Sequence, residues 1–113
     1  MNTRTINTPP EHLAAAGSRF WAAVVSEYDL EPHAAEVLRA ACEQLDRASA
    51  ARAIIDAEGL TTVDRFGQVK PHPAVGIEKE AHLAFMRLRR ELNVDTPPAE
   101  SRGTRPAYYT ARK

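Results

Sequence analysis

Several features on which common protein functions depend are scarce in this sequence. It has a single cysteine, Cys42, so no disulfide can form within the chain and a reducing cytoplasm is the expected compartment. Its five glycines are isolated from one another, so neither a GxGxxG nor a GxxxxGK(S/T) loop is present, which argues against an ATPase. Apolar runs span only a few residues, whereas a membrane helix needs about 20. The polar segment 1–10 lacks the apolar region of a signal peptide.

Side chains that could carry catalysis or bind a metal are also sparse. The four histidines are widely separated. Glu78 and His82 lie one helical turn apart and could contribute to a metal site, although a solvated surface pair is the commoner arrangement and no further ligands are supplied. Cys42 has no neighbouring base in the sequence, so we interpret it as a small buried hydrophobe rather than a nucleophile. We therefore predict no enzyme activity, no cofactor and no metal.

Net charge is also absent, because 15 Lys and Arg balance 15 Asp and Glu. The balance argues against a broadly basic nucleic-acid binder, but the charges are unevenly distributed. Residues 1–86 carry 8 basic and 12 acidic side chains, whereas residues 87–113 carry 7 basic and 3 acidic ones. This asymmetry is typical of a basic segment that binds a polyanion, although ordinary surface variation could also produce it. The candidate DNA-binding residues, inferred from charge, are Arg87, Arg89, Arg90, Arg102, Arg105, Arg112 and Lys113.

Two of these observations have alternative explanations. Arg87, Arg89 and Arg90 fall in the late turns of a predicted helix, where positive charge complements the helix dipole without any ligand. The tail also ends near Tyr108 and Tyr109. Those rings could stack on bases, or the tail could be a docking peptide or simply disordered.

What the chain does contain is alanine, which favours helix. Apolar residues recur at three- and four-residue steps over about 11–28, about 32–58 and about 73–93, which predicts three helices. Gly17 weakens the first helix, which could therefore begin later than Glu11. Pro32 suits the first position of the second helix.

Between the second and third predicted helices the pattern changes to alternation. Residues 61–64 and 68–71 predict a short β-hairpin, with Gly67 suited to a left-handed turn position. The fold class is therefore mainly α: three helices with a small β-hairpin between the second and third. We expect a flexible leader at 1–10, a helical oligomerisation and core domain at 11–96 with the hairpin at 61–71, and a flexible, Pro-rich basic tail at 97–113.

The second helix carries an alanine-rich seam over residues 34–55, with Arg52 as its one polar member. Small side chains let another helix approach closely. That helix could belong to the same chain or to a second copy. The residues predicted to pack in the core or in an oligomer are Trp21, Leu38, Ala41, Leu45, Ile55, Ile77, Phe85, Leu88 and Leu92.

The order of several short motifs is more specific than any one of them. In chain order these are Phe20-Trp21, the helix VLRAACEQLDRA, Glu58-Gly59-Leu60, Phe66-Gly67, His72-Pro73, the helix end RRELNV and Ser101-Arg102. Over about residues 15–103 this order resembles the small subunits of tailed-phage terminases. A departure is Leu92-Asn93-Val94, where the family usually has a Leu-Gly-Leu-like turn. Asn93 can adopt the same left-handed conformation.

The resemblance implies a non-catalytic packaging protein in the cytoplasm of a bacterial host. Such proteins form homo-oligomeric rings, bind viral double-stranded DNA and deliver it to the terminase large subunit, which carries the ATPase and nuclease activities. The resemblance supplies no motif-matched DNA contacts. An alternative from a different class is a small helical adaptor or regulatory protein that forms a dimer or heterocomplex and does not bind DNA.

Overall fold

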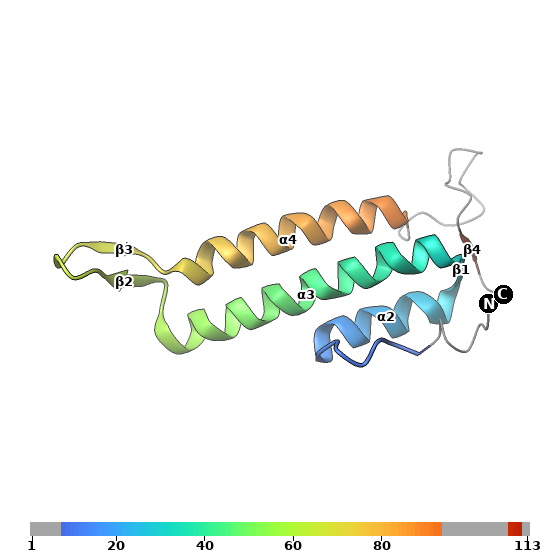
Figure 1. The fold of residues 1–113 in the computed structure, drawn as a ribbon, viewed down its shortest axis with the longest axis horizontal. Helices are drawn as coiled ribbons and strands as arrows, with labels where there is room; N and C mark the ends of the chain where they lie inside the picture. Colours follow the sequence, from blue (N-terminus) through green and yellow to red (C-terminus); the bar gives the residue numbers. More distant parts are fainter. Residues whose placement is uncertain (1–7, 94–108, 112–113) are drawn as a thin grey trace.

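The computed structural model describes residues 8–93 and 109–111. The described residues form three helices, α2 (Ala15–Glu27), α3 (Pro32–Glu58) and α4 (Pro73–Leu92). Helix α3 lies between the other two and runs antiparallel to both (Figure 1). The principal extents are 58 × 30 × 18 Å, and the radius of gyration is 17.5 Å. A compact domain of this length would have about 13 Å, so the molecule is a rod. The predicted fold class is confirmed.

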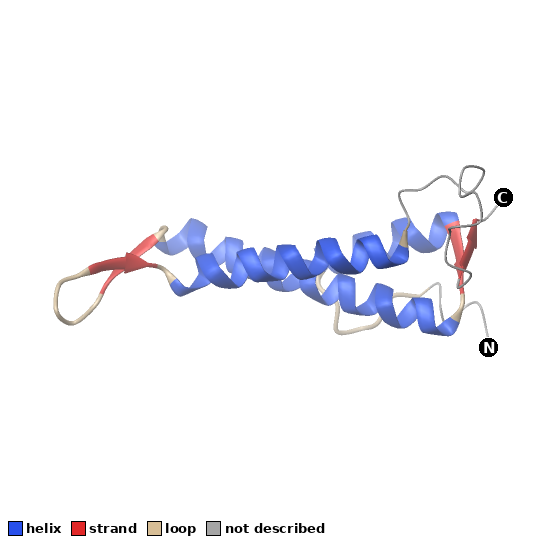
Figure 2. Cartoon of the chain, turned by 90° about the horizontal axis from the view of Figure 1, so that it is seen from above, coloured by secondary structure: helices blue, strands red, loops and turns tan. Residues whose placement is uncertain are grey.

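The hairpin between α3 and α4 is also confirmed. It consists of β2 (Thr61–Val63) and β3 (Val69–Pro71), which pair antiparallel with Val63 opposite Val69. Gly67 adopts a φ of 79°, a conformation that glycine enters without steric cost. The hairpin projects along the long axis, beyond the ends of both helices (Figures 1 and 2).

The opposite end of the rod holds a second small sheet. Here β1 (Tyr28–Leu30), between α2 and α3, pairs antiparallel with β4 (Tyr109–Ala111), and Asp29 lies opposite Thr110. Neither strand is predicted from the sequence. The rest of the predicted tail and residues 1–7 of the predicted leader lie outside the described residues.

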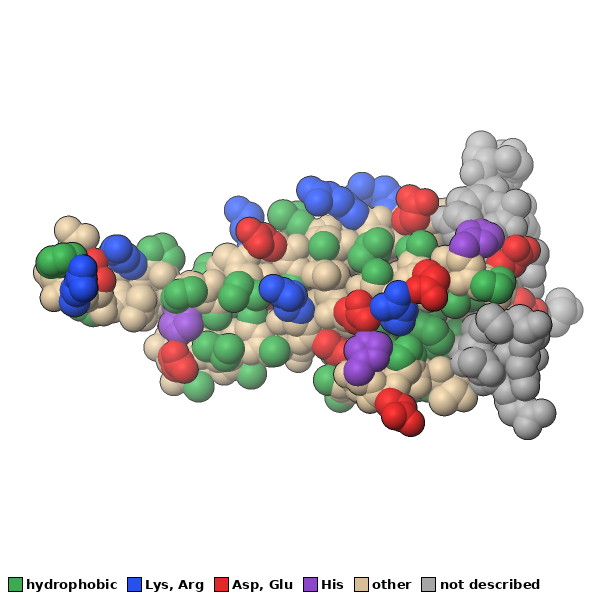
Figure 3. Space-filling model, in the orientation of Figure 1, with side chains coloured by type: hydrophobic (Ala, Val, Ile, Leu, Met, Phe, Trp, Pro, Cys, Tyr) green, Lys and Arg blue, Asp and Glu red, His purple; other side chains and the backbone are tan. Residues whose placement is uncertain are grey.

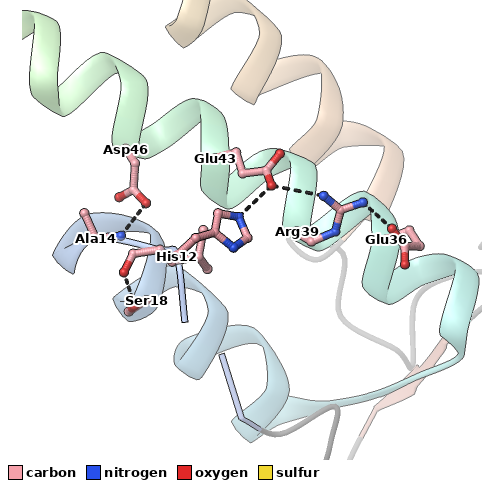
Figure 4. A network of polar contacts seen from close by, with 8 residues as sticks. His12, Ala14, Ser18, Glu36, Arg39, Glu43 and Asp46 are labelled. Carbon is pink, nitrogen blue, oxygen red and sulfur yellow. Dashed lines mark hydrogen bonds and ion pairs between the residues drawn. The ribbon is translucent and has the colours of Figure 1, made fainter. Parts of the chain in front are cut away.

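The start of α2 depends on a side chain from α3. The helix begins at Ala15 rather than near Glu11, and its N-cap Ala14 offers no capping side chain. The Asp46 carboxylate accepts the Ala14 N–H and the Gly17 N–H, both at 2.7 Å (Figure 4). A Cβ on Gly17 would lie 2.8 Å from the Cys42 carbonyl oxygen and 2.7 Å from Asp46 Oδ2. Glycine therefore permits the close contact between α2 and α3, in addition to weakening the helix.

A polar network ties the segment before α2 to the surface of α3 (Figure 4). His12 Nε2 donates to Glu43 Oε2 at 2.7 Å, and Arg39 Nη1 donates to the same oxygen at 3.0 Å. Arg39 also pairs with Glu36. The His12 hydrogen bond, followed by Arg39, lowers the pKa of Glu43 below its ordinary value against the opposing effect of burial. The network fixes the chain that leads into α2.

The main core lies at the β1 end of the rod. Its largest fully buried side chains are Leu38, Cys42 and Leu92, and Trp21 is 4% exposed beside them. Phe20 of α2 meets Phe85 of α4 edge-to-face, with ring centroids 5.1 Å apart. All three helices therefore meet around this end.

Towards the hairpin only α3 and α4 remain in contact, and the core is small. It consists of Ala51, Ile55 and Ala74, with Val75 packed against it. Arg52, the polar member of the predicted seam, is not buried. Its guanidinium donates to Glu78 of α4 through Nε at 3.0 Å and Nη2 at 3.2 Å. This paired contact joins the two helices where few large apolar side chains do.

The predicted packing residues fall into three groups in the single chain. Leu45 and Leu88 are half-buried, and Ile77 is 39% exposed. The buried members are Trp21, Leu38, Ala41, Ile55, Phe85 and Leu92.

Candidate nucleic-acid interface

Local signals at both ends fix the extent of α4. The Nδ1 atom of His72 accepts the Ala74 N–H at 3.0 Å, and Pro73 occupies the first turn. The His72 Nε2–H donates to Glu58 Oε1 at 2.7 Å, so the same ring caps α4 and contacts the end of α3. Asn93 ends the helix in the left-handed region, with a φ of 59°. The left-handed role predicted for Asn93 is confirmed.

The face of α4 directed away from α3 is positively charged and partly apolar. Ala74, Ala81, Phe85 and Leu92 are buried and mark the inner face. The opposite face, which we call the α4 outer face, is exposed along its length. It consists of Lys79, Leu83, Met86, Arg87 and Arg90. Figure 3 shows Lys and Arg side chains gathered along the edge formed by α4, with acidic side chains at both ends of the group, whereas acidic side chains are more frequent over the rest of this view.

The spacing of these cations suits a run of phosphates. At 1.5 Å rise per residue, Lys79 and Arg90 stand about 16 Å apart along the helix axis. Glu80 and Glu91 are also exposed on α4 and lie seven and four residues from Arg87, so acidic side chains border one edge of the α4 outer face. The inner face is packed on α3, so only half of α4 is accessible and the helix cannot enter a groove deeply. Such an arrangement suits contacts with the DNA backbone, which give affinity without reading sequence.

The three arginines predicted at the end of α4 do not act as one group. Arg87 and Arg90 lie on the α4 outer face and are exposed. Arg89 is half-buried and turns towards α2, where it lines a groove with Phe20 and Tyr28. The structure therefore groups two of the predicted residues and separates the third.

The structure does not describe the other four predicted DNA-binding residues, and it adds one cation, Lys79, that the charge argument leaves out. Arg102, Arg105, Arg112 and Lys113 lie outside the described residues. Lys79 was missed, because dividing the chain after Met86 placed it in the acidic segment. Its position three or four residues from its neighbours on one helix face is the signal that would have included it.

The side chains considered for catalysis or metal binding are either buried or held by other protein groups. Cys42 is fully buried, and its desolvation raises the pKa of the thiol to about 12. Glu78 is held by Arg52, and His82 Nε2 lies 3.9 Å from Glu78 Oε2. Within residues 8–93 and 109–111, no group of three potential metal ligands comes together. In the same described part of the chain, no helix is long and apolar enough to cross a membrane.

Comparison with known proteins gives one clear result. A family model described as "Phage terminase, small subunit" matches residues 18–107. The matched segment runs from α2 through α4 and stops just before β4. No curated protein and no solved structure matches the chain.

Proposed function

Because the chain belongs to the family of phage terminase small subunits, we propose that it binds viral double-stranded DNA and delivers it to the terminase large subunit as a homo-oligomeric ring. The family is generally a non-catalytic packaging component. We propose the same for this chain, acting in the cytoplasm of the bacterial host. Family membership favours this function over that of a DNA-independent adaptor.

The observation that carries the DNA-binding part is the α4 outer face. Lys79, Arg87 and Arg90 are exposed on one side of a single rigid helix. Each cation that neutralises a phosphate releases a counterion, so three contacts per chain give a slope of about −2.7 for log affinity against log salt. A ring repeats this face once per copy, which explains how a chain with zero net charge could retain DNA.

The experiment is a salt-dependent titration of the full chain with a DNA duplex of arbitrary sequence, followed by fluorescence anisotropy. The double variant Arg87→Ser/Arg90→Ser removes two phosphate contacts. Affinity should fall, and the salt slope should become shallower by about 1.8 per bound chain. A matched control is Arg19→Ser, which removes an exposed arginine from α2 and should leave the slope unchanged.

A second variant separates the tail from α4. Replacing Arg102, Arg105, Arg112 and Lys113 by Ser keeps the chain length and the residues of β4. If this variant loses DNA retention while Arg87→Ser/Arg90→Ser keeps it, the DNA contact belongs to the tail and not to α4. A chain that ignores DNA at low salt would contradict the proposed function.

A further inference from the structure

The hairpin carries an unusual amount of exposed apolar surface. We define the arm as residues 60–71. Leu60, Val63, Phe66 and Val69 are between 63% and 75% exposed. Val63 and Val69 pair directly across the two strands, so their side chains share one face. A two-stranded hairpin is marginal in water by itself, and clustered exposed apolar side chains are typical of an interaction site.

The chemistry of the arm favours a protein partner over DNA. It has two cations, and both have partners in the arm itself. Lys70 Nζ lies 3.3 Å from Asp64 Oδ2, and the Arg65 guanidinium lies 5.1 Å from the centre of the Phe66 ring. What the arm presents is therefore mainly apolar, with positive charge at its edge.

A complementary surface lies on α3 near the same end of the rod. Starting from Cys42 and Asp46, where α2 packs, the same helix face continues with Ala50, Ala53 and Ala57 at three- and four-residue steps. Because α2 begins at Ala15, it leaves this continuation uncovered. We call it the α3 shelf: Ala50, Ala53, Ile54 and Ala57, all of them exposed.

Charge and shape match the shelf to the arm. Asp56 and Glu58 stand beside the shelf with side chains 68% and 63% exposed, in surface ion pairs with Arg52 and His72 of their own chain. They are opposite in sign to Arg65 and Lys70, whose contacts with Phe66 and Asp64 also lie at the surface, and exposed pairs of this kind exchange at little cost. Small alanines leave room for larger side chains, and Ile54 adds an apolar contact at 43% exposure. The shelf also extends the surface on which α3 already packs against α2.

The arm cannot cover the shelf of its own chain, because it projects away from the helices along the rod axis (Figures 1 and 2). We propose that the arm of one copy packs on the α3 shelf of a neighbouring copy. This inference rests on the proposed function, because it names the contact that would join the copies of the proposed ring. Two different surfaces meet in such a contact, so repeating it generates a ring if the rotation closes.

The test is disulfide trapping between two full-length variants, Phe66→Cys and Ile54→Cys, co-expressed with tags of different length. The native Cys42 is fully buried, and its thiol pKa is raised to about 12, so it should not compete. Mild oxidation should give the mixed disulfide as the main product on a non-reducing gel. The control pairs Phe66→Cys with Leu83→Cys, which is on the α4 outer face and is as exposed as Ile54. That pair should give only background cross-linking.

Each other result overturns the arm-to-shelf contact. Predominant Phe66→Cys homodimers would mean that arms pair with arms. Equal cross-linking to Leu83→Cys would mean that the contact is not specific. Absence of cross-linking in an assembled protein would place the interface elsewhere.

A second variant keeps the test independent of disulfide geometry. Phe66→Ser/Val69→Thr should lose the assembled mass in light scattering and keep its helical circular dichroism, because neither side chain is buried. If the assembly persists and DNA retention is lost, the arm contacts DNA and the inference is wrong. If trapping succeeds but the wild-type assembly ignores DNA, the contact stands and only the proposed DNA function fails.

Discussion

The two ends of the rod differ in the size of the side chains that they bury. At the β1 end, three helices surround Trp21, Leu38 and Leu92. At the hairpin end, two helices enclose Ile55 and alanines, while the larger apolar side chains of the hairpin remain exposed. Burying one large apolar side chain contributes about 1.5–3 kcal/mol. The β1 end is therefore completed within one chain, whereas the hairpin end retains apolar surface for a partner.

The largest effect is expected when one buried side chain is shortened at each end of the rod, which tests the difference in packing. Leu38→Ala should lower the free energy of unfolding by about 3–5 kcal/mol, because a fully buried site between helices cannot collapse easily. Ile55→Ala should cost about 2 kcal/mol, since its neighbours are small and solvent is close. Urea denaturation at one fixed chain concentration measures both. Equal losses would contradict the division into a well-packed and a thinly packed end.

Periodicity in the sequence is sufficient to predict the elements that depend on local signals. The three helices follow from apolar spacing, and the hairpin follows from Gly67 between alternating residues. The pairing of β1 with β4 escapes prediction because each strand has three residues, too few for a pattern. Its two strands also lie far apart in the chain, so no local turn connects them.

Contacts between helices also escape prediction, because their partners lie far apart in the chain. Asp46 caps α2 from α3, and Arg52 pairs with Glu78 across two helices. No spacing within one helix reveals either partner. At the candidate site, the sequence predicts Arg87, Arg89 and Arg90 as DNA-binding from charge alone, and the structure shows Arg87 and Arg90 exposed. The sequence cannot separate Arg89 from them, because helix rotation relative to α2 decides which side each residue occupies.

A glycine substitution in each region should have effects of opposite sign. Gly17→Ala should destabilise the protein by about 1–3 kcal/mol despite the higher helix propensity of alanine. The reason is that the new Cβ would lie 2.8 Å from the Cys42 carbonyl oxygen. Gly76→Ala in α4 meets nothing within 4 Å and should stabilise by up to about 1 kcal/mol. Thermal unfolding followed by circular dichroism measures both changes.

Both variants replace glycine by alanine in a helix, so they change helix propensity in the same way. A difference between their stabilities therefore measures the effect of close packing at Gly17. If Gly17→Ala is as stable as wild type, α2 can shift away from α3. The β1 end would then be less tightly constrained than the buried core indicates.

Acid should act on the two ends through different carboxylates, with the smaller and more local effect at the hairpin. The Asp64 side chain accepts the Gln68 N–H at 3.0 Å and the Phe66 N–H at 2.8 Å. These bonds, that to Gln68 foremost, lower the pKa of Asp64 below its ordinary value of 3.8. A carboxyl group with a lowered pKa stabilises folding above its ordinary value, and the contribution is lost as pH falls through the folded-state pKa. The hairpin should therefore fray below pH 3.8.

Substitution of Asp64 separates the charge from the hydrogen bonds. Asp64→Asn keeps an oxygen that can accept the two N–H groups but cannot titrate, so the amide signals of Phe66 and Gln68 in NMR should lose their acid response. Asp64→Ala removes the acceptor and should fray the turn at every pH. At the β1 end, protonating Glu43, whose ordinary pKa is 4.5, should release His12 but leave the resonances of buried Trp21 in place, because that core is apolar. If acid shifts Trp21 as early as Phe66, the two ends do not respond independently.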